Sequence, residues 1–172
     1  MIKLVASDLD GTLLHNYQQT VPKEIYDTIK ALHEKGIIFT AASGRQYANI
    51  RRLFAPLGFD IPYIAENGSM CVYKEEILAT GLTPSKTIRH ILDALMEYRK
   101  IYHTGHCILS VKDTYYSDST DERFIDYMEN DMHNIVTYVP DLYAIKEPII
   151  KAAICDFGCL LYTSPSPRDY AA

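Results

Sequence analysis

The chain has 172 residues, 48% of them hydrophobic, and carries a formal net charge of −5 at pH 7. This length suffices for one buried core together with part of a second. The sequence lacks the basic stripe that a nucleic-acid-binding surface requires. Its apolar runs also fall far short of the roughly 20 residues that cross a membrane as a helix. We therefore expect a protein that binds neither nucleic acid nor membrane.

Cysteine usage indicates a reducing compartment. The cysteines form no CxxC pair and no zinc-ligand spacing, and they are Cys71, Cys107, Cys155 and Cys159. Such thiols stay reduced in the cytosol. The N-terminus also lacks the apolar segment and cleavage site of a signal peptide. We expect a cytoplasmic protein with no obligate protein partner.

Residues 1–82 alternate strand and helix signals. Short apolar runs rich in β-branched residues predict strands at 2–6, 37–41 and 61–65. Between them, Pro22 is well placed to start one helix, and apolar residues at helical spacing mark a second, which ends near Gly58. This order is typical of a parallel sheet with crossover helices. The pattern then predicts a hairpin with strands at 70–73 and 77–82.

Residues 83–158 show a different order of elements. The boundary falls at Thr83-Pro84-Ser85, and an amphipathic helix is expected to follow it. Ser119 or Thr120 is expected to cap a further helix, with Asp121 in its first turn. Strands are predicted at 107–111, 114–117 and 149–155. This order favours an α+β module distinct from the first part.

The last residues differ from the rest of the chain. Residues 159–169 follow a predicted strand without any turn signal, and they resemble the in-frame translation of a sequencing-library adaptor. Such segments are left out of fold prediction. We interpret 159–172 as a non-native tail and expect the natural protein to continue beyond about Gly158. A natural Ser/Pro-rich tail is the alternative that the composition allows.

Two aspartates follow the first predicted strand in the motif Asp8-Leu9-Asp10-Gly11-Thr12. Ligands of an open parallel sheet bind outside the carboxyl ends of its strands. Side chains two apart in an extended segment point the same way, so Asp8 and Asp10 can converge on a cation such as Mg²⁺, which prefers hard oxygen ligands. Gly11 permits a sharp turn that brings backbone N–H groups near an anion. An ordinary Asp-Gly turn is the alternative.

Polar groups also follow the next two predicted strands. Ser43 and Gly44 combine a hydroxyl with a helix start and so suit a phosphate group. Arg45 would add a bidentate phosphate contact, and the alternative is an N-cap serine beside a solvated arginine. Asn67, in the Asn-Gly turn after the third strand, is expected at the same edge and is a candidate substrate contact.

Residues 1 to about 79 resemble the haloacid dehalogenase superfamily, specifically the Cof-type subfamily with a type IIB cap. The resemblance rests on the Asp8–Thr12 motif, on Ala42-Ser43-Gly44-Arg45 and on Glu66-Asn67-Gly68. Residues 83–156 are similar to the beginning of that subfamily's cap. The resemblance implies a doubly wound α/β core with a parallel sheet and an inserted α+β cap, both incomplete at the C-terminus.

The resemblance also implies a mechanism. Asp8 would attack phosphorus and form an aspartyl-phosphate, while Asp10 would protonate the leaving alcohol and then activate water. Both aspartates would hold Mg²⁺, and Arg45 and Asn67 would contact the substrate. The implied phosphate-binding set is Leu9, Gly11, Ser43 and Gly44. The implied substrates are small phosphorylated metabolites, either sugar phosphates or phosphorylated cofactors.

Two motifs of the family are missing, a lysine after the cap and a second acidic pair. Lys146 and Lys151 lie within the cap-like region and are not assigned to the lysine's role. We therefore expect a magnesium-dependent phosphatase that is inactive as this chain alone. A phosphomutase or phosphotransferase of the same fold and a non-catalytic phosphate-binding α/β module remain as alternatives.

Overall fold

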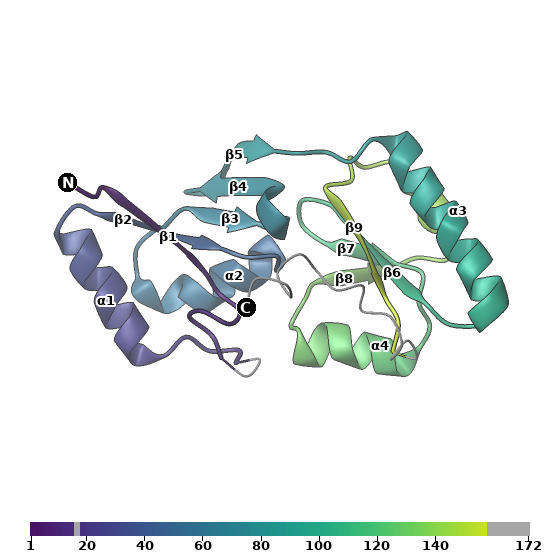
Figure 1. Ribbon diagram of the computed structural model, residues 1–172, viewed down its shortest axis with the longest axis horizontal. Coiled ribbons are helices and arrows are strands. Elements are labelled where there is room, and N and C mark those ends of the chain that lie inside the picture. Colours follow the sequence, from purple (N-terminus) through teal and green to yellow (C-terminus); the bar gives the residue numbers. More distant parts are fainter. Residues whose placement is uncertain (16–17, 158–172) are drawn as a thin grey trace, which may run out of the picture.

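The computed structural model describes residues 1–15 and 18–157 of the chain. These residues form two β-sheets that lie side by side, each with its own helices (Figure 1). One hydrophobic cluster belongs mainly to the first sheet and two belong to the second. We call the elements from β1 to β5 the first module and those from α3 to β9 the second module. The expected non-native tail, residues 159–172, lies outside the described residues.

The first sheet has the strand order β1-β2-β3-β4-β5. In that order its strands are Leu4–Asp8, Ile38–Ala42, Tyr63–Ala65, Met70–Tyr73 and Glu76–Thr80. The first three strands are parallel, and β4 and β5 add an antiparallel hairpin. Asp8 lies opposite Ala42, and Ala42 lies opposite Ile64, so the carboxyl ends of the parallel strands meet at one edge. The expected α/β fold class is thereby confirmed.

Two helices connect the parallel strands. Helix α1 (Lys23–Glu34) follows Pro22 as predicted, and α2 (Tyr47–Phe54) leads through the 3-10 turn η1 (Ala55–Leu57) to β3. The helices contact each other, since the Tyr26 hydroxyl on α1 donates to the Leu53 carbonyl oxygen on α2 at 2.6 Å. Their apolar sides share one hydrophobic cluster with the sheet.

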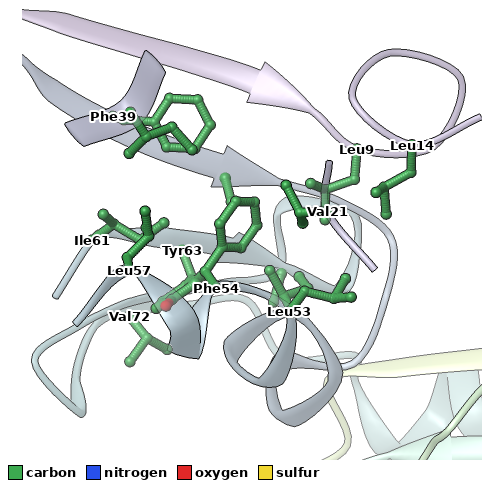
Figure 2. Packing of buried hydrophobic residues seen from close by; sticks show 14 of the residues in the cluster. Leu9, Leu14, Val21, Phe39, Leu53, Phe54, Leu57, Ile61, Tyr63 and Val72 are labelled. Carbon is green, nitrogen blue, oxygen red and sulfur yellow. The ribbon is translucent and has the colours of Figure 1, made fainter. Parts of the chain in front are cut away.

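Aromatic side chains form the centre of this cluster (Figure 2). Phe54 of α2 points between Phe39 of β2 and Tyr63 of β3, with ring centroids 5.9 and 6.4 Å away. Rings that bury this much apolar area contribute strongly to the stability of a domain. The packing therefore fixes α2 against the strand ends that carry the polar motifs of the sequence.

Several strand boundaries differ from the predictions by one or two residues; β2, for example, spans Ile38–Ala42 rather than 37–41. The first strand spans Leu4–Asp8 rather than 2–6, because its register with β2 runs from Leu4 to Asp8. Asp8 is therefore the last residue of the strand and does not lie beyond it. In the hairpin, β5 ends at Thr80 rather than at residue 82, and the reversal uses positive φ angles at Lys74 and Glu75.

The second sheet has the strand order β8-β7-β6-β9. In that order its strands are Val136–Tyr138, Tyr115–Ser117, His106–Ser110 and Lys151–Cys155. Strand β6 pairs antiparallel with β7 and β9, and β8, which the sequence pattern did not predict, pairs parallel with β7. Helix α3 (Ser85–Tyr102) packs with one hydrophobic cluster of this module. Helix α4 (Glu122–Asp126) and the π-turn η3 (Tyr127–Asp131) pack with another, and a 3-10 turn, η4 (Leu142–Ala144), precedes β9.

The predicted cap of α4 is wrong. Asp121 is the N-cap, because its carboxylate accepts from the backbone N–H groups of Arg123 at 2.8 Å and Phe124 at 3.1 Å. Ser119 instead accepts from the Asp121 N–H at 3.2 Å and contacts His106. The Asp121 carboxylate satisfies two N–H groups that have no partner within the helix, and its negative charge suits the positive end of the helix dipole. Asp121 is therefore a better cap here than Ser119 or Thr120.

Within the described residues the chain passes from the first module to the second once, after β5, and this connection is hydrogen-bonded to the segment before β9. The Thr83 N–H donates to the Ile149 carbonyl at 2.7 Å, and the Thr83 hydroxyl donates to the Ile150 carbonyl at 3.0 Å. In the described part of the chain, every helix is too short or too polar to span a membrane.

Candidate active site

Asp8 and Asp10 stand at the carboxyl end of β1. The prediction that they share one extended segment is wrong, because the chain turns directly after Asp8. The N–H groups of Leu13 and Leu14 donate to the Leu9 carbonyl at 2.9 and 2.8 Å, and the Leu9 side chain is fully buried. Gly11 has the positive φ of 83° that this turn needs. Leu9 therefore anchors a tight loop that exposes both aspartates at the strand end.

Arg45 fixes the Asp10 carboxylate. Its Nε lies 3.0 Å from Asp10 Oδ2 and its Nη2 lies 2.6 Å from Asp10 Oδ1, so the contact is bidentate. The Arg45 side chain is only 5% exposed, and its Nη1 donates to Gln19 at 3.0 Å and to Asn49 at 3.4 Å. A guanidinium held by several acceptors orients its carboxylate partner firmly. Arg45 is thus occupied by protein groups in this structure, and the predicted substrate contact stays a prediction.

Ser43 follows β2 at the same sheet edge. Its backbone N–H donates to the Ile64 carbonyl at 2.9 Å, and its Oγ accepts from the Arg45 N–H at 3.1 Å. The same Oγ lies 3.5 Å from Asp10 Oδ2. The structure therefore brings the hydroxyl of Ser43 to the carboxylate of Asp10, as the strand-end argument predicts.

Asn67 lies against Gly44. A Cβ at position 44 would overlap the Asn67 side-chain oxygen, so only glycine permits this approach. The Asn67 N–H also donates to the Ser43 carbonyl at 3.2 Å. The loop after β2 and the turn after β3 are thus locked together beside Asp10.

Glu66 belongs to the Glu66-Asn67-Gly68 motif, but the sequence assigns it no role of its own. It is 1% exposed, and both Glu66 and Asn67 have positive φ angles, of 54° and 58°. Consecutive residues in this conformation are strained unless other contacts hold them. The Glu66 N–H donates to the Arg45 carbonyl at 3.2 Å, which supplies one such contact.

Lys151 of the second module pairs with Glu66. Its Nζ lies 2.5 Å from Glu66 Oε2 and donates to the Gly44 carbonyl at 2.9 Å. Tyr115 of β7 lies on the same side, and burial together with the Glu66 charge raises the pKa of Tyr115. A cation from β9 therefore connects the loop after β2 with the turn after β3. No signal in the sequence could have paired these residues, because the pairing depends on how the modules dock.

Gln46, the N-cap residue of α2, and Asn49 within α2 make a second contact between the modules. The Gln46 amide donates to the Ile135 carbonyl at 3.0 Å and accepts from the Ile135 N–H at 2.8 Å. The Asn49 amide donates to the Met132 carbonyl oxygen. Both side chains are almost fully buried, so the backbone polar groups of the segment before β8 are satisfied by the first module.

A cavity of about 330 Å³ lies between the modules. Its first-module wall consists of Asp10, Gly44 and Arg45, and Lys151 borders them. Its remaining lining residues come from the second module and are His106, Ile108, Tyr115, Phe124, Tyr127, Met128, Met132, Asn134, Ala153, Ile154 and Cys155. This volume falls within the range of roughly 300–1,000 Å³ that is common for ligand pockets.

The donor set at the strand end suits a hard cation. Asp8 offers an exposed carboxylate, and Asp10 offers its main-chain carbonyl while Arg45 holds its carboxylate. Mg²⁺ takes one or two protein oxygens together with waters and phosphate oxygens. Residues 1–15 and 18–157, however, contain no group of three or more His, Cys, Asp or Glu side chains that could hold a metal ion. The donor atoms present are oxygens, the type that Mg²⁺ prefers, and they supply only part of a coordination shell.

Comparison with known proteins identifies a matching family and several relatives of this chain. A family model described as haloacid dehalogenase-like hydrolase matches residues 5–158. Phosphoglycolate phosphatase 1 of Saccharolobus solfataricus is 39% identical over 77 residues, which cover 44% of this chain and 34% of that protein. The phosphoglycolate phosphatase of Staphylothermus marinus is 28% identical over 173 residues, which cover 98% and 67%.

Solved structures agree in fold. A haloacid dehalogenase-like hydrolase of B. subtilis superposes with a TM-score of 0.70 at 20% identity, over 86% of this chain and 59% of that one. At this identity the likeness concerns the fold alone. The chain spans between about one third and two thirds of the length of these proteins.

Proposed function

The chain belongs to the haloacid dehalogenase-like hydrolases, and from that premise we propose that it carries the nucleophile and the phosphate loop of a magnesium-dependent phosphatase acting on small phosphorylated metabolites. The observation that carries the proposal is the meeting of three strand ends. There Asp8 ends β1, Ser43 lies 3.5 Å from Asp10, and Asn67 locks the glycine of the loop. The names of the phosphoglycolate phosphatases among its relatives support the reaction class.

The proposed reaction has two displacement steps at phosphorus. A carboxylate oxygen of Asp8 forms a bond to phosphorus while the bond to the leaving oxygen breaks, and Asp10 gives that oxygen a proton. Asp10 then takes a proton from water, whose oxygen bonds to phosphorus as the bond to Asp8 breaks. Asp8 returns to a free carboxylate, and inorganic phosphate leaves.

The other side chains of the site position these groups. Ser43 and the backbone N–H groups of Gly44 and Leu9 would hold the phosphoryl oxygens, because N–H groups at a loop and helix start attract anions. The Gly11 N–H, which the sequence placed in this set, instead donates to the Leu14 carbonyl at 2.8 Å. Arg45 orients the Asp10 carboxylate. Mg²⁺, held by Asp8 and the Asp10 carbonyl, would neutralise negative charge on the phosphate.

The test is substitution of the nucleophile in a full-length protein that contains this chain. We expect Asp8→Asn to abolish Mg²⁺-dependent phosphate release from a panel of phosphate esters, and Asp10→Asn to come close to doing so. A factor of ten corresponds to only about 1.4 kcal/mol of barrier. Activity of a tenth or more in Asp8→Asn would therefore exclude covalent catalysis by Asp8.

We also propose that residues 1–172 alone do not turn over substrate. Phosphoryl transfer depends on positioning and on charge stabilisation, and the cations of the described site already have carboxylate partners, Arg45 with Asp10 and Lys151 with Glu66. Phosphate release by this chain with Mg²⁺, measured over the same panel, should stay at background. Turnover of about 1 per second or more would contradict the proposal.

A further inference from the structure

Three consecutive backbone carbonyls of the loop after β2 are held by two different parts of the molecule. The Ser43 and Arg45 carbonyls accept from backbone N–H groups of the turn after β3, both at 3.2 Å. The Gly44 carbonyl between them accepts instead from the Nζ of Lys151 at 2.9 Å. The middle peptide of this loop therefore takes its partner from β9 of the second module.

The peptide between Gly44 and Arg45 also places the Ser43 hydroxyl. Its carbonyl is the one that Lys151 holds, and its N–H group donates to Ser43 Oγ at 3.1 Å. A hydroxyl oxygen that accepts from an N–H group turns its own proton away from that donor. Ser43 is 7% exposed, so the direction of its proton depends on this peptide more than on solvent.

Glycine makes the orientation of this peptide easy to lose. Gly44 has no Cβ to restrict the rotation of the peptide that follows it. A cation on the Gly44 carbonyl fixes the peptide plane. The same cation polarises the peptide and makes the Arg45 N–H a stronger donor, because hydrogen bonds in a chain strengthen one another. Lys151 can therefore act on the Ser43 hydroxyl through a single peptide unit.

Three groups surround the Lys151 ammonium. Its Nζ lies 2.5 Å from Glu66 Oε2, 2.9 Å from the Gly44 carbonyl and 5.5 Å from the centroid of the Tyr115 ring. An ammonium has three donor directions, and a cation at this distance is attracted to the face of an aromatic ring. These three groups take up the three directions, so Lys151 reaches the phosphate site through the peptide rather than by contact.

We infer that Lys151 is a positioning residue of the phosphate loop. Docking of the second module sets the Gly44–Arg45 peptide, and this peptide aims the Ser43 hydroxyl at the phosphoryl group. The inference rests on the proposed function, because it takes Ser43 as a phosphate ligand. By linkage, phosphate bound at Ser43 should in turn favour the docked arrangement of the two modules.

The experiment measures binding of inorganic phosphate to the 172-residue chain by calorimetry in the presence of Mg²⁺. Every chain carries Glu66→Gln, so that removal of Lys151 leaves no buried charge without a partner. In this background we expect Lys151→Met to weaken phosphate binding by at least about fivefold. Lys146→Met removes an exposed cation near the same strand, and as the matched control it should bind as the background chain does.

A thermodynamic cycle with Ser43→Ala separates positioning from direct charge. If Lys151 acts through the hydroxyl, Lys151→Met should change phosphate binding by less than about twofold once Ser43→Ala is present. A loss that persists without the hydroxyl shows direct contact and overturns the inference alone, as does no loss in the background chain. If Ser43→Ala leaves binding unchanged, or the background chain binds no phosphate, the proposed phosphate site fails and the inference falls with it.

Amide NMR tests the peptide itself in the absence of phosphate. Without the ammonium on the Gly44 carbonyl, the Arg45 N–H becomes a weaker donor, so its proton resonance should move upfield in the Lys151→Met chain. The Gly36 amide, which donates to the His33 carbonyl after α1, is the internal reference and should stay in place. An unmoved Arg45 resonance in a folded variant overturns the inference.

A second variant covers the case in which Lys151→Met unfolds. In Lys151→Gln the nitrogen lies a bond nearer the main chain, so it loses the Gly44 carbonyl while it keeps a polar partner for position 66. We expect the same loss of phosphate binding and the same upfield shift. Circular dichroism and thermal unfolding establish that each variant is folded, and background values in a folded Lys151→Gln chain overturn the inference.

Discussion

Lys151, the first residue of β9, holds the buried carboxylate of Glu66 across the boundary between the two modules, with Nζ and Oε2 2.5 Å apart. Its Nζ also reaches the Gly44 carbonyl at 2.9 Å. Docking of the second module and the shape of the loop after β2 are therefore coupled through one side chain. Because Glu66 is 1% exposed and Lys151 is 17% exposed, solvent screens the pair only slightly.

We predict that Lys151→Met strongly destabilises the chain, because it leaves the Glu66 charge buried without a partner. The expected loss in unfolding free energy is about 3 kcal/mol, the lower end of the range for breaking a buried pair. Urea denaturation followed by circular dichroism measures it. Lys146→Met, at an exposed lysine near the same strand, is the control and should change stability little.

A double variant tests whether Glu66 and Lys151 act as an ion pair. Glu66→Gln combined with Lys151→Met removes both charges, so it should be more stable than Lys151→Met alone. If the loss in unfolding free energy of the double variant equals or exceeds the sum of the two single losses, the two side chains do not act as a pair.

The contact between Gly44 and Asn67 leads to a second prediction. Gly44→Ala would place a methyl group on the Asn67 side-chain oxygen, so the Asn67 side chain must leave its position against the loop after β2. We expect a loss of about 1–3 kcal/mol in unfolding free energy, as for other overpacked sites. Gly81→Ala is the control, since a Cβ there meets open space. Chemical denaturation of both variants should separate them clearly, and equal stabilities would show that Asn67 does not constrain Gly44.

His106 leads to a prediction about pH. Burial lowers its pKa from the ordinary 6.5 and outweighs the attraction of Asp121, whose Oδ2 lies 3.8 Å from Nε2. Below about pH 6.5 the unfolded chain therefore binds more protons than the folded one, and His106 makes the unfolding free energy fall as the pH is lowered further. The stability it contributes is fully present above pH 6.5 and is lost toward its depressed folded pKa.

The change to test is His106→Asn, which removes the titrating ring. We expect the decline in unfolding free energy between about pH 6.5 and 5 to be less steep in this variant than in the parent. His90→Asn, at an exposed position of α3, serves as the control and should keep the slope of the parent. Urea midpoints collected at several pH values give the comparison, and identical slopes in His106→Asn and the parent would exclude His106 as the source.

The sequence was informative wherever a local rule decides the structure. Asp8, Ser43 and Asn67 each follow or end a short apolar run, and the ends of parallel strands meet at one edge, so their placement at one edge was predictable. The α4 cap was missed because several capping residues compete within three positions, and Asp121 alone reaches two free N–H groups. Local propensity does not decide such a competition.

The site's ion pairs could not be read from the sequence. Arg45 was interpreted as a phosphate contact because its neighbours suit phosphate, whereas the structure directs its guanidinium to Asp10. Glu66 and Lys151 belong to different modules, and neither carries a local signal for the other. Pairings of this kind depend on tertiary docking and on the need to compensate a buried charge.

The outer strand of the first sheet leads to the last prediction. Within the described residues β1 pairs only with β2, so its other edge has unpaired backbone groups. Leu4 is 54% exposed, and its register partner Ile38 is 50% exposed, which places an apolar pair on the uncovered side of this edge. Exposed apolar strand edges promote pairing with other chains. We therefore expect residues 1–172 to self-associate as concentration rises.

Leu4→Lys tests this expectation, because a lysine on an edge strand blocks strand pairing between chains. Sedimentation velocity over a range of concentrations should show less association for Leu4→Lys than for the parent. Ile101→Lys makes the same change at a residue of α3 that is 66% exposed, and it should associate as the parent does. Equal suppression by both variants would point to a general effect of charge, and continued association of Leu4→Lys would show that the contact between chains lies away from β1.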